Sequence, residues 1–173
     1  MRNKKKEITA AIVVIGNEVL SGRTQDKNIN FIASELVKIG IRLEEVRVIP
    51  DSEKKIINTV NELRRKFTYI FTTGGIGPTH DDITSTAIAK AFKVKLMLNQ
   101  KAVKAMKSHY KPGDLNEARL KMAYIPKGAK LINNPVSKAP GFVIKNVYVM
   151  AGIPIIMQAM FSEIKSTLRA GKK

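Results

Sequence analysis

The sequence predicts a three-layer α/β fold, in which a doubly wound, mainly parallel sheet carries helices on both faces. Residues 8–15 are a run of apolar and β-branched residues, which is typical of a strand buried in a parallel sheet. Strand-like runs then alternate with helical patterns as far as residue 92, and such alternation favours βαβ units. A glycine-rich turn, Gly74–Gly77, follows the third strand-like run, at the edge where doubly wound sheets bind ligands.

The first half of the chain gives the clearest elements. A loop at 16–24 follows the first strand, and Asp26 can cap a helix that runs to about Ile39, because its apolar residues recur with a period of 3.6. Gly40 is placed to end that helix. The second strand is expected at 42–49. Pro50–Ser52 is then a turn into a helix with an apolar face, followed by a strand at 67–73 and a helix at 85–92.

The second half has a weaker pattern beyond residue 98. Helices are expected at 99–110 and 115–123, short strands at 130–132, 141–144 and 147–150, and a closing helix from Pro154 to about Arg169. A chain of 173 residues with 44% hydrophobic content is the size of one domain with a real core. We therefore expect a single domain, 1–173, with a short basic tail at 1–6.

Composition excludes several chemistries. The chain has no cysteine and only two histidines, so disulfides, thiolate metal sites, a cysteine nucleophile and a multi-histidine metal site are ruled out. Basic residues at 2–6 before the apolar run 8–15 imitate a signal peptide, but Asn17 and Glu18 follow without a small-residue cleavage site. No stretch has the length of a transmembrane helix. We expect a cytoplasmic protein that does not engage a membrane.

The net charge of +17, from 31 basic and 14 acidic residues, predicts attraction of anions. The lysines are scattered, except for a series at helical spacing formed by Lys101, Lys104, Lys107 and Lys111. Aromatic residues make up 6% of the chain and tryptophan is absent, which is little for base stacking. The composition thus favours a phosphorylated small molecule over nucleic acid as the partner.

The glycine-rich turn carries the chemistry. Gly74, Gly75 and Gly77 let the backbone turn sharply and approach a ligand. Their N–H groups can form an anion-binding nest, and the following helix adds its positive N-terminus. Asp81 and Asp82 come next, and paired carboxylates beside a phosphate nest suit a metal-assisted phosphate or pyrophosphate site. The alternative is that one of these aspartates only caps the helix.

The whole chain resembles a known family. Five ordered motifs are similar to those of the molybdopterin-binding domain shared by MoaB/Mog-type proteins and the N-terminal domain of CinA-type competence/damage-inducible proteins. The resemblance extends to the N-terminal domain of eukaryotic FAD synthases. The motifs are the glycine loop 72–84, the first loop 16–22 with Asp26 and Asn28, the turn 48–51, Asn134 with 139–142, and 152–154.

The resemblance implies two chemistries. MoaB/Mog-type members bind molybdopterin, and some adenylylate it with ATP and a divalent metal. The CinA and FAD-synthase branch is linked to hydrolysis of the pyrophosphate bond in ADP-ribose or FAD. We expect a metal-dependent nucleotide pyrophosphatase. The alternatives are a molybdopterin-binding or molybdopterin-adenylylating module and a non-catalytic basic binding domain. Relatives also imply a homo-oligomer, either a dimer or a trimer.

The expected site combines the residues with the resemblance. Asp51, Asp81 and Asp82 are the candidate catalytic carboxylates and the candidate ligands of Mg²⁺, Mn²⁺ or Co²⁺, since carboxylates and water suit these ions. The remaining candidates would bind the substrate. Hydroxyls of Ser21, Thr73 and Thr79 and N–H groups of Gly74, Gly75 and Gly77 would hold phosphate, Asp26 and Asn28 a ring or ribose, and Gly22, Pro140 and Gly141 belong to the matching loops.

Three further positions matter. Glu18 is a candidate ligand or a structural salt-bridge residue, and His80 is a candidate acid or a solvated loop residue. Ile156 stands where the family often has a glutamate two residues after the proline of the Gly-x-Pro motif, and Ala151 stands where it usually has glycine. The change at Ile156 puts in question any metal or water ligand at that position.

Overall fold

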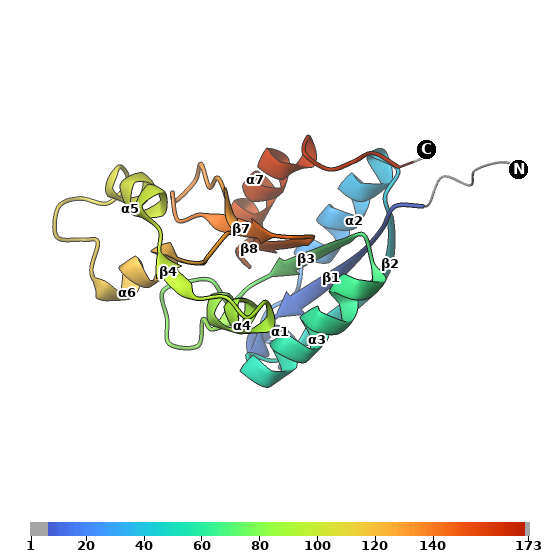
Figure 1. The fold of residues 1–173 in the computed structure, drawn as a ribbon, viewed down its shortest axis with the longest axis horizontal. Helices are drawn as coiled ribbons and strands as arrows, with labels where there is room; N and C mark the ends of the chain where they lie inside the picture. The colour runs from blue at the N-terminus through green and yellow to red at the C-terminus, as the bar shows by residue number, and fades with distance from the viewer. Residues whose placement is uncertain (1–6, 172–173) are drawn as a thin grey trace, which may run out of the picture.

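A computed structural model describes residues 7–171 of the protein. The fold is built on a six-stranded sheet (Figure 1). The strand order is β2-β1-β3-β8-β7-β6, with the first four strands parallel and the last two antiparallel to their neighbours. The basic tail at 1–6 lies outside the described residues. The strands are β1 (Thr9–Ile15), β2 (Arg42–Ile49), β3 (Tyr69–Thr73), β6 (Lys130–Ile132), β7 (Gly141–Ile144) and β8 (Val147–Met150).

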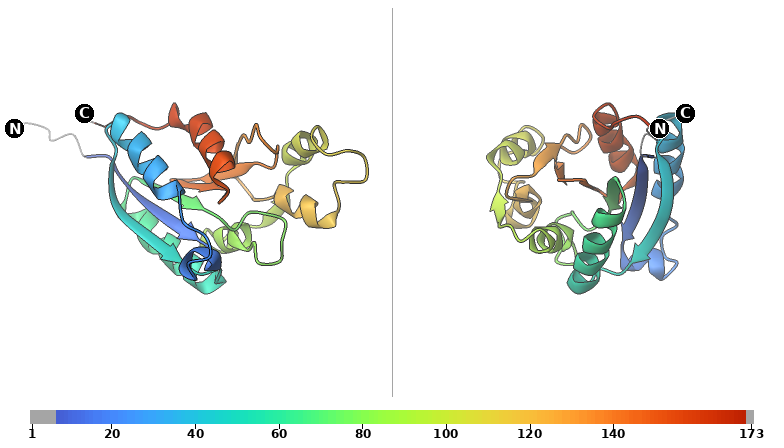
Figure 2. Two further views of the ribbon diagram at one scale, coloured as in Figure 1. Left: turned by 180° about the vertical axis from the view of Figure 1, so that it is seen from behind. Right: turned by 45° about the vertical axis from the view of Figure 1, so that its right-hand side comes forward.

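Helices cover both faces of this sheet, as Figure 2 shows. One face packs against α2 (Asn28–Lys38) and α7 (Pro154–Lys165), and the other against α3 (Glu53–Lys66) and α4 (Thr84–Ala91). Each face has its own buried apolar cluster, because side chains of β1 alternate between the two. The predicted three-layer, doubly wound α/β fold is confirmed. Within residues 7–171, no helix is both long and apolar enough to cross a membrane.

A small lobe projects from one end of the sheet, and it contains the elements between α4 and β6 (Figure 1). Two short antiparallel strands, β4 (Leu96–Leu98) and β5 (Tyr124–Pro126), join α5 (Gln100–Lys107), α6 (Glu117–Leu120) and a 3₁₀ turn at Lys121–Ala123. The lobe has a separate apolar cluster centred on Ala102, Val103 and Met106. The helices α5 and α6 are shorter than the helices predicted at 99–110 and 115–123, and β5 was not predicted.

Local capping sets the helix boundaries. Lys27 holds the N-cap position of α2, and Asp26, one residue earlier, accepts a hydrogen bond from the Ile29 N–H in the first turn at 2.9 Å. Gly40 follows that helix with φ of 72°, the left-handed conformation that ends many helices. Ser52 caps α3 by accepting from the Lys55 N–H at 3.4 Å. The first loop contains one helical turn, α1 (Asn17–Leu20), where a loop was expected.

Gly74 lies where the ends of β1, β3 and β8 meet. Its N–H donates to the Met150 carbonyl at 3.1 Å, and its φ is 98°. A side chain at this position would overlap the Ile15 carbonyl oxygen. The backbone of Gly152 also packs closely against the Gly74 Cα. Backbone therefore packs on backbone here, so no residue other than glycine fits.

Substituting Gly74→Ala should lower the free energy of unfolding by about 3 kcal/mol or more, because it adds a steric overlap to an unfavourable backbone conformation. Gly22→Ala is the matched control. Gly22 also has positive φ, at 75°, but open space surrounds it, so only the conformational cost of about 1–2 kcal/mol applies. Urea unfolding of both variants checks this, and equal losses would contradict it.

Candidate functional site

Three loops come together at the carboxyl ends of the parallel strands. The loop 16–24 follows β1, Pro50–Ser52 follows β2, and the glycine loop 74–83 follows β3. The order β2-β1-β3 makes these ends neighbours, as expected for a doubly wound sheet. Two cavities flank the glycine loop, one lined by its beginning and one by its later part.

The glycine loop is held in shape by Thr84, the first residue of α4. The Thr84 hydroxyl donates to the Gly74 carbonyl at 3.0 Å, and the Thr84 N–H donates to the Gly75 carbonyl at 2.9 Å. Since the Gly74 N–H is bonded to Met150, it is not free to donate to a phosphate as predicted. Within the described chain, the N–H groups of Gly75 and Gly77 donate to no carbonyl. They remain the candidate anion donors.

The Asp82 carboxylate stabilises the later part of the same loop through hydrogen bonds. One of its carboxylate oxygens, Oδ2, accepts from the Thr79 N–H at 2.9 Å and from the Thr79 hydroxyl at 2.8 Å. The same carboxylate packs against Gly77, where a side chain would not fit. The alternative that Asp81 or Asp82 caps α4 is wrong, since Ile83 holds that position and no side chain caps the helix. Asp82 instead closes a turn ahead of it.

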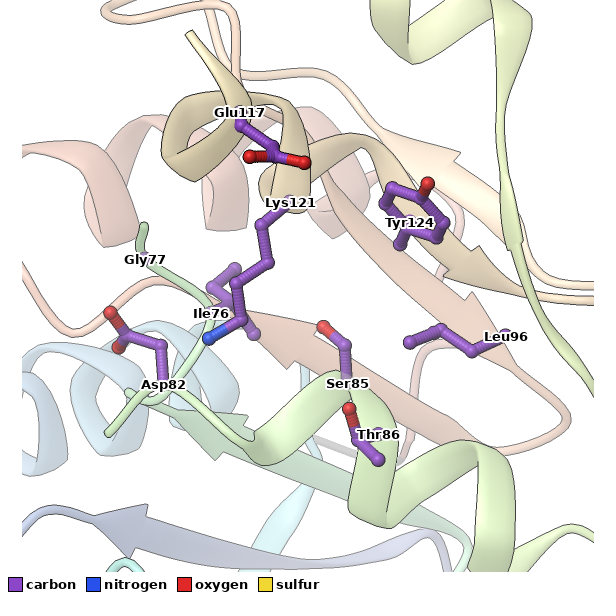
Figure 3. Close-up of a pocket in the computed structure, with 9 residues that line it drawn as sticks. All are labelled: Ile76, Gly77, Asp82, Ser85, Thr86, Leu96, Glu117, Lys121 and Tyr124. Carbon is purple, nitrogen blue, oxygen red and sulfur yellow. The ribbon is translucent and has the colours of Figure 1, made fainter. Parts of the chain in front are cut away.

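The larger cavity, of about 280 Å³, lies between the glycine loop and the lobe (Figure 3). Its polar part includes Asp82, Ser85 and Thr86, and Lys121 extends from the lobe so that its ammonium contacts the Thr79 carbonyl. Its apolar part is formed by Ile76, Leu96 and Tyr124.

Of the residues that line this cavity, the sequence predicted only Gly77 and Asp82 as site residues and missed Ile76, Ser85, Thr86, Leu96, Glu117, Lys121 and Tyr124. Lys121 and Tyr124 were the hardest of these to foresee. Lys121 lies within the helix expected at 115–123, and Tyr124 follows it directly. Neither residue shares a motif with the glycine loop, so the sequence offered no signal that would join them to it.

The smaller cavity, of about 50 Å³, lies on the other side of the loop. Several predicted residues line it, namely Glu18, Asp26, Asn28, Thr73 and Gly74. The structure thus brings together two motifs that are far apart in the sequence, the first loop and the start of the glycine loop. Asn28 and Thr73 are buried there, although both are polar.

Asp51 is engaged at a third place. Its carboxylate accepts from the Asn17 N–H at 3.0 Å, and its own N–H donates to the Asn17 side chain at 3.1 Å. Asp81 is exposed, and its carboxylate lies 3.3 Å from His80, which is also exposed. Among residues 7–171, no three acidic or histidine side chains are grouped so that they could hold a metal ion. The structure does not gather the three predicted carboxylates into one cage.

Other predicted residues lie outside the two cavities. Ser21 is exposed and donates to the Glu18 carbonyl at 3.3 Å, and Gly22 faces open space. Pro140 and Gly141 are buried, with Gly141 packed on the Val149 carbonyl. Asn134 orders the neighbouring turn by donating to the Ala139 carbonyl at 2.8 Å. Ile156 packs on the apolar cluster beneath α7, so this position presents no ligand.

Comparison with known proteins gives the class. The family described as "Probable molybdopterin binding domain" matches residues 11–170, so the chain belongs to that family. The CinA protein of Thermoplasma acidophilum has the same fold with a TM-score of 0.88 and 32% identity over 93% of this chain and 98% of that one. MoaB of Thermus thermophilus shares the fold alone, with a TM-score of 0.61 and 16% identity over 93% and 91% of the chains.

Two curated relatives match most of this chain. A CinA-like protein of Sulfurihydrogenibium sp. is 34% identical over 95% of this chain. A protein of Caldivirga maquilingensis is 40% identical over 92% of it. The chain spans 43% and 65% of the lengths of these two relatives. Together with the Thermoplasma structure, they show a MoaB/Mog-like domain of CinA type.

Lys121→Met should weaken binding of inorganic pyrophosphate about tenfold, because it removes the ammonium at the glycine loop and keeps the apolar stem. The matched control is Lys104→Met, which removes an equal charge from an exposed position on α5. Calorimetry at two salt concentrations checks this. A similar loss in both variants would mean that net charge alone attracts the anion.

Proposed function

We propose that this domain binds a nucleotide whose two halves are joined by a pyrophosphate, and that it hydrolyses that linkage. The observation that carries the proposal is the placement of the glycine loop, with the unpaired N–H groups of Gly75 and Gly77, between two cavities of different chemistry. A pyrophosphate on the loop would have a group attached on each side. ADP-ribose and FAD have this form, and they are the substrates that the sequence resemblance implies.

The larger cavity suits a flat ring. Tyr124, Leu96 and Ile76 give it an apolar wall, and aromatic side chains stack on bases with any hydrogen-bonding pattern. Ser85 and Thr86 stand at the start of α4, where hydroxyls and N–H groups can orient polar atoms of a ligand. The cavity volume of about 280 Å³ approaches the lower end of known ligand sites.

The phosphates would lie against hydrogen-bond donors and one ammonium, with the Asp82 and Glu117 carboxylates in the wall of the same cavity. The free N–H groups of Gly75 and Gly77, the N-terminal end of α4 and the ammonium of Lys121 border the same loop. Such preformed donors stabilise charge that develops on phosphate oxygens without having to reorganise. The net charge of +17 would add long-range attraction for an anionic substrate.

A divalent metal is part of the proposal, but not in a cage of three carboxylates. The residues do not fit such a cage, because Asp51, Asp81 and Asp82 are engaged at separate places. They fit the looser arrangement in which Mg²⁺ is held mainly by substrate phosphates and water, with one carboxylate. Asp82 would be that carboxylate, since its Oδ1 accepts no hydrogen bond within residues 7–171. The metal would neutralise phosphate charge.

The activity test is direct. The purified chain should release AMP from ADP-ribose or FAD in the presence of Mg²⁺, Mn²⁺ or Co²⁺, and release should stop when a chelator removes the metal. Chromatography of the products measures AMP. If neither dinucleotide is cleaved under any of the three metals, the pyrophosphatase proposal fails.

Asp82→Asn should reduce AMP release about 10²- to 10³-fold, because a carboxylate charge at the reacting phosphates is lost. The melting temperature should hardly change, since an amide oxygen can still accept both Thr79 hydrogen bonds. Activity and melting temperature measured on the same preparation check this.

Asp82→Ala is the matched structural variant. It removes the acceptor of both hydrogen bonds and should cost about 1 kcal/mol or more of stability. Full activity in Asp82→Asn, with instability only in Asp82→Ala, would reduce Asp82 to a residue that shapes the loop.

A molybdopterin-binding or molybdopterin-adenylylating module is the second candidate. Its support is the family description and the shared fold with MoaB proteins, including the tungsten cofactor synthesizing protein MoaB of Pyrococcus furiosus, with a TM-score of 0.60 and 18% identity over 93% and 92% of the chains. Tight binding of molybdopterin by a chain that cleaves no dinucleotide would favour it. A non-catalytic basic domain would instead retain DNA in a strongly salt-dependent way.

A further inference from the structure

Two residues that line the smaller cavity carry buried side-chain atoms without a hydrogen-bond partner. Asn28 and Thr73 are only 4% and 1% exposed, and both line the cavity. Among the described residues, the Asn28 Oδ1 and the Thr73 hydroxyl have no hydrogen-bond partner. Buried polar atoms are almost always paired, so unpaired ones need an explanation. Two such atoms in one cavity point to a missing partner.

The orientation of the Asn28 amide is fixed by its other end. The Asn28 Nδ2 donates to the Gly152 carbonyl at 2.9 Å, so an exchange of nitrogen and oxygen would set two acceptors against each other. The Oδ1 therefore faces its surroundings as a pure acceptor. Glu18 and Asp26 also line the cavity, and one oxygen of Asp26 is engaged by the Ile29 N–H. The cavity is rich in hydrogen-bond acceptors, so a ligand that fits it should carry hydrogen-bond donors.

The size of the cavity limits the choice. A volume of about 50 Å³ corresponds to a few water molecules, which is enough for the hydroxyl edge of a sugar and too small for a nucleobase. Gly74 is part of its wall, so the cavity begins beside the anion-binding loop. A sugar attached to a phosphate on that loop would reach it.

We propose that the cavity formed by Asn28, Thr73, Glu18 and Asp26 recognises adjacent hydroxyls of a ribose whose phosphate lies on the glycine loop. The proposal rests on the proposed function, since it assigns the ribose 5-phosphate half of ADP-ribose, a group that FAD lacks. The sugar hydroxyls would donate to Asn28 Oδ1 and to the carboxylates, and the Thr73 hydroxyl would complete the set. The larger cavity would then hold the base.

Thr73→Val tests this with little structural cost. Valine has the same shape and suits a strand, and the hydroxyl it replaces has no partner in the free protein. The melting temperature should stay equal or rise, because an unsatisfied buried group is removed. Thr72→Val is the matched control. Thr72 is the preceding residue of β3, is equally buried and has an unpartnered hydroxyl, but it does not line the cavity.

The probes are ribose 5-phosphate and 2-deoxyribose 5-phosphate, which differ by one hydroxyl, measured by calorimetry. The parent protein and Thr72→Val should prefer ribose 5-phosphate by about 3- to 10-fold, the effect of one hydrogen bond. Thr73→Val should lose that preference, and binding of inorganic pyrophosphate should be unchanged in all three proteins.

Other outcomes overturn the inference. Equal binding of both sugars by the parent protein, or no binding of either, would mean that the cavity holds only water. A metal-dependent rise in melting temperature that Thr73→Val abolishes, without sugar discrimination, would assign the cavity to a cation. The hydrolysis proposal is tested by a separate measurement. If it alone is wrong, the protein releases no AMP from ADP-ribose or FAD but still discriminates between the two sugar phosphates.

Discussion

The site depends on one close approach of backbone to backbone. Gly74 fits between the Ile15 carbonyl and Gly152 while it continues the β3–β8 hydrogen bonding. That contact draws the end of β1, the glycine loop and the start of α7 into one place. Thr84 then donates hydrogen bonds to the carbonyls of Gly74 and Gly75, and within the described residues the N–H groups of Gly75 and Gly77 have no backbone acceptor. The fold thus creates unpaired donors as a by-product of tight packing.

The roles of the glycine-loop residues differ along its length. Gly74 is structural, Gly75 and Gly77 supply free donors, and Asp82 ties Thr79 back onto the loop. A carboxylate that holds a turn through one oxygen and leaves the other free can serve both structure and ligand binding. The structural role found here differs from the helix cap that the sequence offered as an alternative, because Asp82 bonds Thr79 ahead of α4.

Much of the architecture was predictable, because it follows local rules. The strands at 42–49, 130–132, 141–144 and 147–150 match the expected bounds, since β-branched runs flanked by turn residues leave little choice. Asp26 and Gly40 bound their helix as capping chemistry requires. By contrast, Lys121 and Tyr124 reach the site only through the packing of the lobe, and no local pattern encodes that. The unpaired state of Asn28 Oδ1 is likewise a tertiary property.

The larger cavity is shared between the main sheet and the lobe between α4 and β6. The glycine loop belongs to the main sheet, whereas Leu96, Lys121 and Tyr124 belong to the lobe, which has its own apolar cluster. The lobe therefore supplies two of the apolar residues that would contact the ring, Leu96 and Tyr124, and also the Lys121 ammonium that would face the phosphates. Mutations at Leu96 or Tyr124 would change the wall offered to a ring while the backbone contact at Gly74 stays intact, whereas any movement of the lobe would also shift the Lys121 ammonium away from the glycine loop.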